Sequence, residues 1–184
     1  MKRIARFHKV SREQFIRDCM DCMEGEMDEK DKARAEQSYE QIRLPHRATS
    51  GSAGYDFFLP CSLVLAPGKE VKIPTGIRAE MEEGWVLMLY PRSGLGFKYR
   101  LQMNNTVGII DSDYFYSDNE GHILIKLFND GREGKTLELK AGMAVAQGIF
   151  MEYGITIDDD VEEVRNGGFG STDGGNGKNN EQEK

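Results

Sequence analysis

The stretch PRSGLG, from Pro91 to Gly96, combines residue types that bind phosphate. Arg92 offers charge-assisted hydrogen-bond donors in a planar fork, and Ser93 adds a hydroxyl group. Gly94 has no Cβ, so backbone amides around it are free to approach a phosphate closely. The same residues also fit an ordinary turn after a strand. The stretch alone therefore leaves a phosphate cradle and a plain turn both open.

A second stretch, NNTVGIIDSDY, places two carboxylates two residues apart after an apolar run. Asp111 and Asp113 share one face if the strand continues through them, whereas at a strand end only one of them need point at a ligand. A carboxylate beside a phosphate is able to orient and deprotonate a water molecule. A solvated turn is the alternative interpretation.

The third stretch is RNGGFGSTDG, at residues 165–174, in a region too polar and glycine-rich to order itself. Arg165 is suited to pair with a phosphate, Phe169 to stack on a flat base, and Ser171 with Thr172 to cap the outermost phosphate. A segment that closes over its ligand in this way excludes water from the reaction. Taken singly, the same residues also fit a linker.

Composition limits the classes of protein that remain. The chain has 184 residues, which suits one domain with a sizeable core. Its formal net charge of -7 argues against non-specific nucleic-acid binding, and an anionic ligand would need locally basic residues or a metal cation. We find neither an apolar run of the roughly 18 residues that a membrane helix needs nor the apolar core of a signal peptide. Because three cysteines form no disulfide framework, we expect a cytoplasmic protein.

The elements that must position these residues change character along the chain. Residues 1–10 alternate weakly between apolar and polar side chains and predict an edge strand. Ser11 has the features of a helix N-cap, with Gln14 at the position that completes a capping box. We therefore expect a helical insertion over 11–38.

Residues 39–164 consist of short β-branched or alternating segments separated by Pro-Gly, Glu-Gly and Asp-Gly turns. Many strands without helices between them predict an all-β barrel or sandwich. The remaining residues, 165–184, are expected to form a mobile tail. The predicted strands are Leu63–Leu65, Glu70–Ile73, Trp85–Tyr90, His122–Phe128, Thr136–Lys140 and Met143–Tyr153.

Considered together and in this order, the stretches resemble the motifs of the trimeric dUTPase family. The resemblance covers about two thirds of the chain, and five ordered motifs at family-like spacing are highly specific. The matching motifs are AGYD (Ala53 to Asp56), PRSGLG, NTVGIIDSDY (Asn105 to Tyr114), GMAVAQ (Gly142 to Gln147) and RNGGFGST (Arg165 to Thr172).

The resemblance implies a jelly-roll-like β-barrel that assembles as a homotrimer with active sites shared between subunits. It implies hydrolysis of dUTP to dUMP and pyrophosphate, which limits uracil incorporation into DNA and supplies dUMP for thymidylate synthesis. It also implies Mg²⁺ as the cofactor, which would answer the need for a cation raised by the acidic composition. The mobile tail of one subunit would close over a pocket built by the others.

Residue roles follow from the same resemblance. Asp111 would hold and activate the attacking water, and Tyr114 would pack under the deoxyribose and exclude a 2'-hydroxyl. Asp56 and Gln147 would lie near the water shell of the metal, which is held indirectly through water and phosphates. The implied substrate-binding residues are Asn105, Gly108 and Leu124 for uracil, Arg92, Ser93, Gly94 and Gln147 for phosphate, and Arg165, Phe169, Gly170, Ser171 and Thr172 in the tail.

Two segments depart from the family pattern. FYSDNE, at residues 115–120, intervenes before Gly121, so Tyr116 is an alternative to Tyr114 as the sugar residue. The helical insertion at 11–38 is not part of the minimal fold, and either segment is a candidate contact for a protein partner. Two other functions stay open: a dCTP deaminase-like enzyme, and a regulatory binding protein built on the same scaffold. The sequence also predicts His122 at the surface or in a sheet.

Overall fold

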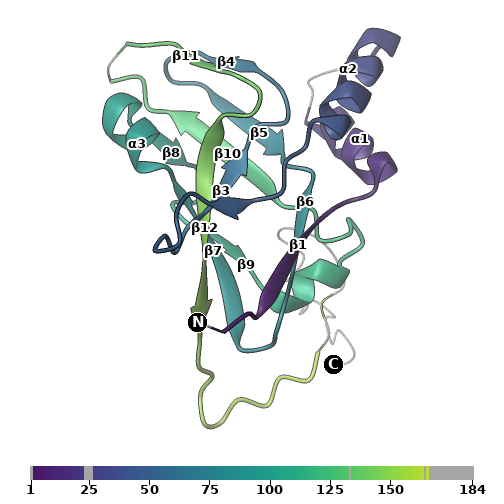
Figure 1. Ribbon diagram of the computed structural model, residues 1–184, viewed down its shortest axis with the longest axis vertical. Coiled ribbons are helices and arrows are strands. Elements are labelled where there is room, and N and C mark those ends of the chain that lie inside the picture. Colours follow the sequence, from purple (N-terminus) through teal and green to yellow (C-terminus); the bar gives the residue numbers. More distant parts are fainter. Residues whose placement is uncertain (1, 23–26, 133, 164, 166–184) are drawn as a thin grey trace, which may run out of the picture.

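The computed structural model describes residues 2–22, 27–132, 134–163 and 165, and it consists mostly of β-strands with a few helices (Figure 1). The strands are β1 (Ala5–Lys9), β2 (His46–Arg47), β3 (Tyr55–Phe58), β4 (Leu63–Leu65), β5 (Glu70–Pro74), β6 (Ile77–Met81), β7 (Trp85–Pro91), β8 (Leu101–Met103), β9 (Gly108–Ile110), β10 (Leu124–Asn129), β11 (Leu137–Leu139) and β12 (Ala144–Glu152). All six strands predicted from the sequence are present, with ends that shift by up to two residues.

The strands form four antiparallel sheets. The largest has the order β2-β3-β12-β7-β9, and a three-stranded sheet has the order β5-β10-β8. Two further pairs join β1 to β6 and β11 to β4. Inward-facing side chains of these sheets make one apolar core. In β10 and just before it, Ile123, Ile125 and Leu127 are fully buried whereas Lys126 is exposed, as the alternating pattern predicts.

Two helices, α1 (Arg12–Asp21) and α2 (Glu29–Glu40), pack against each other, and α1 also contacts β5 (Figure 1). Ser11 caps α1, since its side chain accepts a hydrogen bond from the Gln14 amide. The predicted capping box is incomplete, however. The Gln14 side chain bonds Asp18 instead, and the Ser11 amide donates to the distant Glu120. The carboxylate of the distant Glu120 therefore takes the place of the local Gln14 carboxamide.

The prediction of strands without intervening helices is wrong at one place. Helix α3 (Ser93–Tyr99) lies between β7 and β8, where the sequence indicated a turn. Two glycines in seven residues disfavour a helix, but Leu95 and Tyr99 pack against the apolar core. Tertiary contacts therefore outweigh the local preference. A short 3-10 helix, η1 (Ser112–Tyr116), follows β9.

No helix in the described part of the chain is both long and apolar enough to cross a bilayer.

Candidate functional site

Four of the five motifs overlap neighbouring strands of the five-stranded sheet, namely β3, β12, β7 and β9. β12, which carries Gln147, runs between β3 and β7, and β9 pairs with the other side of β7. Gln147 is paired in register with Asp56 on β3 and with Tyr90 on β7. Residues up to 91 positions apart in sequence are thus brought side by side by one ladder of backbone hydrogen bonds.

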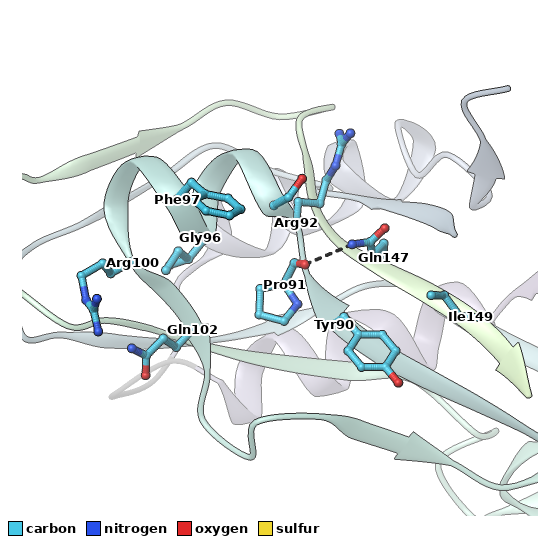
Figure 2. Close-up of a pocket in the computed structure, with 11 residues that line it drawn as sticks. Tyr90, Pro91, Arg92, Gly96, Phe97, Arg100, Gln102, Gln147 and Ile149 are labelled. Atoms are coloured by element: carbon cyan, nitrogen blue, oxygen red, sulfur yellow. Dashed lines mark hydrogen bonds between the residues drawn. The ribbon is translucent and has the colours of Figure 1, made fainter. Parts of the chain in front are cut away.

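The first part of the site is a groove of about 730 Å³ at the end of β7, which we call the phosphate groove (Figure 2). The Gln147 side-chain amide donates to the Pro91 carbonyl oxygen at 3.3 Å. The Nε atom of Arg92 lies 3.4 Å from an oxygen of Asp56, so that carboxylate is paired with an arginine. The polar residues that line the groove are Tyr90, Arg92, Ser93, Arg100, Gln102 and Gln147.

Two sequence-predicted residues lie beside the phosphate groove rather than in its lining. Gly94 occupies the first turn of α3, and Asp56 reaches the groove only through its ion pair with Arg92. Packing explains why the motif has a glycine at position 54, because a Cβ there would lie 2.7 Å from the side-chain oxygen of Gln147. The absence of a side chain at Gly54 therefore leaves room for Gln147.

The second part is a pocket of about 370 Å³, which we call the base pocket. It contains all three residues expected to read uracil: Asn105, Gly108 and Leu124. They come from the turn before β9, from β9 and from β10. Asn119, from the segment between η1 and β10, also lines the pocket, and no motif predicted it there.

Asp111 follows Ile110, which itself lines the base pocket. The Asp111 side chain is 47% exposed and accepts a hydrogen bond from Arg165 at 2.6 Å. The same guanidinium donates to Asp113 at 3.1 Å. Arg165, assigned from the sequence to a phosphate of the ligand, therefore bridges the two carboxylates of its own chain. Its charge compensates both of them.

Tyr114 lies in η1 with only 3% of its surface exposed. Its hydroxyl donates to the His122 carbonyl oxygen at 2.8 Å. Burial raises the pKa of this phenol, so it remains a neutral donor. Tyr116, the alternative sugar residue, is 78% exposed. Of the two tyrosines, Tyr114 is the one fixed beside Asp111, although its predicted contact with a sugar stays a prediction.

His122 is fully buried, and the prediction of a surface position is wrong. Its Nε2 atom accepts from the Gly76 amide at 2.7 Å, and its Nδ1 atom pairs with Asp18 of α1. Asp18 comes 104 residues earlier in the chain, so no local pattern announces this contact. Burial acts to raise the pKa of Asp18, but hydrogen bonds from His122 and Gln14 outweigh it and lower that pKa overall.

The tail residues Phe169, Gly170, Ser171 and Thr172 lie outside the described part of the chain, as do all residues from 166 onward. Among the described residues, no group of three or more His, Cys, Asp or Glu side chains is arranged to hold a metal ion. Mg²⁺ usually keeps several waters and uses one or two carboxylates together with substrate phosphates. Asp56 beside the phosphate groove fits that indirect mode.

The two parts of the site are far apart within one chain. Asp111 follows Ile110, which pairs with Leu87 of β7, so Asp111 lies near the level of Val86. Arg92 is six residues further along, which corresponds to roughly 20 Å at about 3.3 Å per residue. Leu89 lines the base pocket and the adjacent Tyr90 lines the phosphate groove, so the two hollows lie on opposite faces of the sheet.

Comparison with known proteins agrees with the motifs. The dUTPase family model matches residues 40–173. The deoxyuridine 5'-triphosphate nucleotidohydrolase of Lactococcus lactis is 42% identical over 134 residues, which are 71% of this chain and 88% of the relative. The enzyme of the same name from Tolumonas auensis is 39% identical over 140 residues, covering 72% of this chain and 88% of the relative.

Solved structures give the same result. The crystal structure of the dUTPase from Streptococcus mutans is 32% identical, with a TM-score of 0.60, over 82% of this chain and 97% of that one. A variant of the dUTPase from phage phi11 of S. aureus, with a coordinated structural Mg(II) ion, is 25% identical, with a TM-score of 0.55, over 67% and 92% of the two chains. The chain belongs to the dUTPase family.

Proposed function

We propose that this protein hydrolyses dUTP to dUMP and pyrophosphate. The observation that carries the proposal is the meeting of Asn105, Gly108 and Leu124 in the base pocket, in a chain whose motifs and relatives are those of dUTPases. The activity would limit uracil incorporation into DNA and supply dUMP for thymidylate synthesis. The three cysteines are free, which supports the cytoplasm as its compartment.

In the proposed reaction, Asp111 accepts a proton from a water molecule whose oxygen attacks the α-phosphorus. The bond between that phosphorus and its bridging oxygen breaks, and pyrophosphate leaves. Asn105, Gly108 and Leu124 select uracil, while Tyr114 lies under the deoxyribose. A site whose polar groups pair only with the correct base rejects a mismatched one strongly, because those groups would otherwise stay buried and unpaired.

Phosphates bind at the groove, where Arg92, Ser93 and the backbone at Gly94 supply donors and positive charge. Mg²⁺, when bound with the nucleotide, neutralises part of the triphosphate charge and fixes its shape. Asp56 and Gln147 would contact the water shell of that ion. The tail residues Phe169, Gly170, Ser171 and Thr172 complete the site by covering the base and the outermost phosphate.

We further propose that the site is completed in a homotrimer of jelly-roll-like subunits. A triphosphate is too short to bridge roughly 20 Å between the two parts of one chain, so Asp111 and Arg92 of one site come from different subunits. The segment from the end of β12 onward supports assembly, since Met151, Tyr153, Ile155 and Ile157 alternate and are all exposed. In Figure 1 this segment runs beyond the sheet and curves back below η1. An exposed alternating arm of this kind is suited to pair with another subunit.

The test is a panel of dUTP, UTP, dTTP and dCTP, each incubated with the purified protein and Mg²⁺. We expect pyrophosphate release from dUTP and at least about a hundredfold lower kcat/KM for the other three. Ammonia release from dCTP would instead identify a dCTP deaminase-like enzyme. Absence of any turnover would leave a binding protein on the same scaffold and would contradict the proposal.

A further inference from the structure

The Tyr114 hydroxyl is held from two sides by the segment that follows it. It donates to the His122 carbonyl oxygen, and it accepts from the Asn119 side-chain amide at 2.8 Å. The Asn119 side-chain oxygen in turn accepts from the Gly121 amide at 3.2 Å. Because Asn119 also lines the base pocket, one side chain contacts both the buried tyrosine and the cavity that the nucleoside would enter.

Residues 115–120, which we call the inserted loop, are held to the sheet by hydrogen bonds and packing. Gly121 has a φ of 67°, and a Cβ there would lie 2.6 Å from the Tyr114 carbonyl oxygen, so the loop folds tightly back on η1. Arg78 donates to the Phe115 carbonyl oxygen at 2.6 Å, and its guanidinium lies 3.6 Å from the centre of the Phe115 ring. These contacts fix the loop where it leaves η1.

Helix α1 fastens the other end of the inserted loop. Glu120 accepts from the Ser11 amide at 2.7 Å and from the Ser11 hydroxyl at 2.6 Å. Those hydrogen bonds outweigh the effect of burial and lower the pKa of Glu120, so it stays a charged acceptor. The two segments that depart from the family pattern, the helical insertion and the inserted loop, are therefore joined directly.

A second connection runs through the buried His122. The Gly76 amide donates to Nε2, so the ring proton lies on Nδ1 and is donated to Asp18. Asp18 is held in place by the side-chain amide of Gln14 at 2.9 Å. Since the carbonyl of His122 receives the Tyr114 hydroxyl, α1 fixes the acceptor on which the tyrosine depends.

We propose that Asn119 is a sugar-specificity residue, and that Asp18 and Glu120 are positioning residues that hold it and Tyr114 in place. The inference rests on the proposed function. An apolar pocket rejects a ligand with an added hydroxyl only about a hundredfold. If Tyr114 were free to move away from the sugar, it would discriminate less against a 2'-hydroxyl. Exclusion of the 2'-hydroxyl therefore depends on how firmly Tyr114 is anchored. The helical insertion stabilises the inserted loop through the contacts of Ser11 with Glu120 and of Asp18 with His122.

The test compares binding of dUMP and UMP by calorimetry in the full-length protein. Asn119→Ala should lower the preference for dUMP over UMP by about fivefold, since one hydrogen bond to the tyrosine is lost. Asp118→Ala, an exposed neighbour in the same loop, should leave the preference unchanged. Asp18→Asn should lower it by about threefold while the thermal midpoint shows that the protein is folded.

An unchanged preference in folded Asn119→Ala and Asp18→Asn would overturn the inference. The readout is separate from hydrolysis. A wild-type protein that prefers dUMP, shows the expected change in the variants, and yet fails to cleave dUTP would support the inference and contradict the proposed reaction. A wild-type protein that binds both nucleotides equally would overturn the inference whatever its activity.

Discussion

Asp111 and Asp113 share one guanidinium, that of Arg165. The same arginine was assigned from its motif to a phosphate of the ligand. A bound triphosphate would compete for the guanidinium and release Asp111 to accept a proton. The pairing also explains how two carboxylates two residues apart are accommodated without repulsion.

Asp111→Asn is expected to reduce kcat for dUTP by about a hundredfold to ten-thousandfold, the contribution of a positioned general base. Affinity for dUTP should be nearly unchanged because the side chain keeps its size and position. The measurement is pyrophosphate release together with calorimetric binding. Asp113→Asn, which removes the other partner of Arg165, serves as the matched control, and its kcat for dUTP should fall much less. Equal kcat in wild type and Asp111→Asn would remove Asp111 from the proposed role.

At the scale of elements, α1 is attached to the sheets by buried polar contacts as well as by the apolar side chain of Phe15. Asp18 is 7% exposed and its pKa is lowered, so folding favours its charged form. A group with a lowered folded pKa contributes stability above its ordinary pKa, here 3.8, and that contribution is lost as the pH falls through the lower folded value.

Asp18→Asn should therefore lower the free energy of unfolding by about 2 kcal/mol at pH 7, the size expected for a hydrogen-bonded buried charge. The difference from wild type should shrink as the pH falls from 3.8 through the lower folded pKa, because the wild-type carboxylate becomes protonated over that range. Urea unfolding at a series of pH values measures this. Glu13→Gln, on the exposed face of the same helix, should have little effect. A difference that is constant with pH would contradict the assignment.

Removal of residues 166–184 tests the role of the tail. The truncated chain keeps every described element, so its thermal midpoint should match that of the full chain. The value of kcat/KM for dUTP should fall by at least about tenfold, because contacts to the base and the outermost phosphate are lost. Steady-state kinetics measures kcat/KM for the two proteins, and thermal unfolding measures their midpoints. Unchanged kinetics would rule out a tail that closes over the site.

At the scale of the whole molecule, the decisive feature is the separation of Asp111 from Arg92 along β7. If the site is shared between subunits, a mixture of two inactive variants should recover activity, because some mixed sites contain both intact residues. Asp111→Asn and Arg92→Gln, unfolded together in equal amounts and refolded, should regain about one quarter of wild-type activity, since half of the chains supply each intact part. Each variant refolded alone is the control. Activity no higher than these controls would show that every site belongs to one chain.

The sequence by itself indicated the family, through its resemblance to five ordered motifs, and it predicted the edge strand in residues 1–10 and six further strands, because such strands show in local composition and periodicity. The alternation of Ile123, Ile125 and Leu127 is an example, since a strand with one buried face needs only a period of two. The preference of Ser11 for a helix start was likewise visible, because the cap bonds an amide three residues away.

Only the tertiary structure decided which partners those residues take. Ser11 bonds Glu120 across 109 positions and His122 bonds Asp18 across 104, and no short pattern carries such pairings. The helix α3 formed against the local preference of its glycines because its apolar side chains found a core to pack on. The positions of the phosphate groove and the base pocket on opposite faces of one sheet were not predictable either. They depend on strand order and register, which are set by contacts that form only when the whole chain has folded.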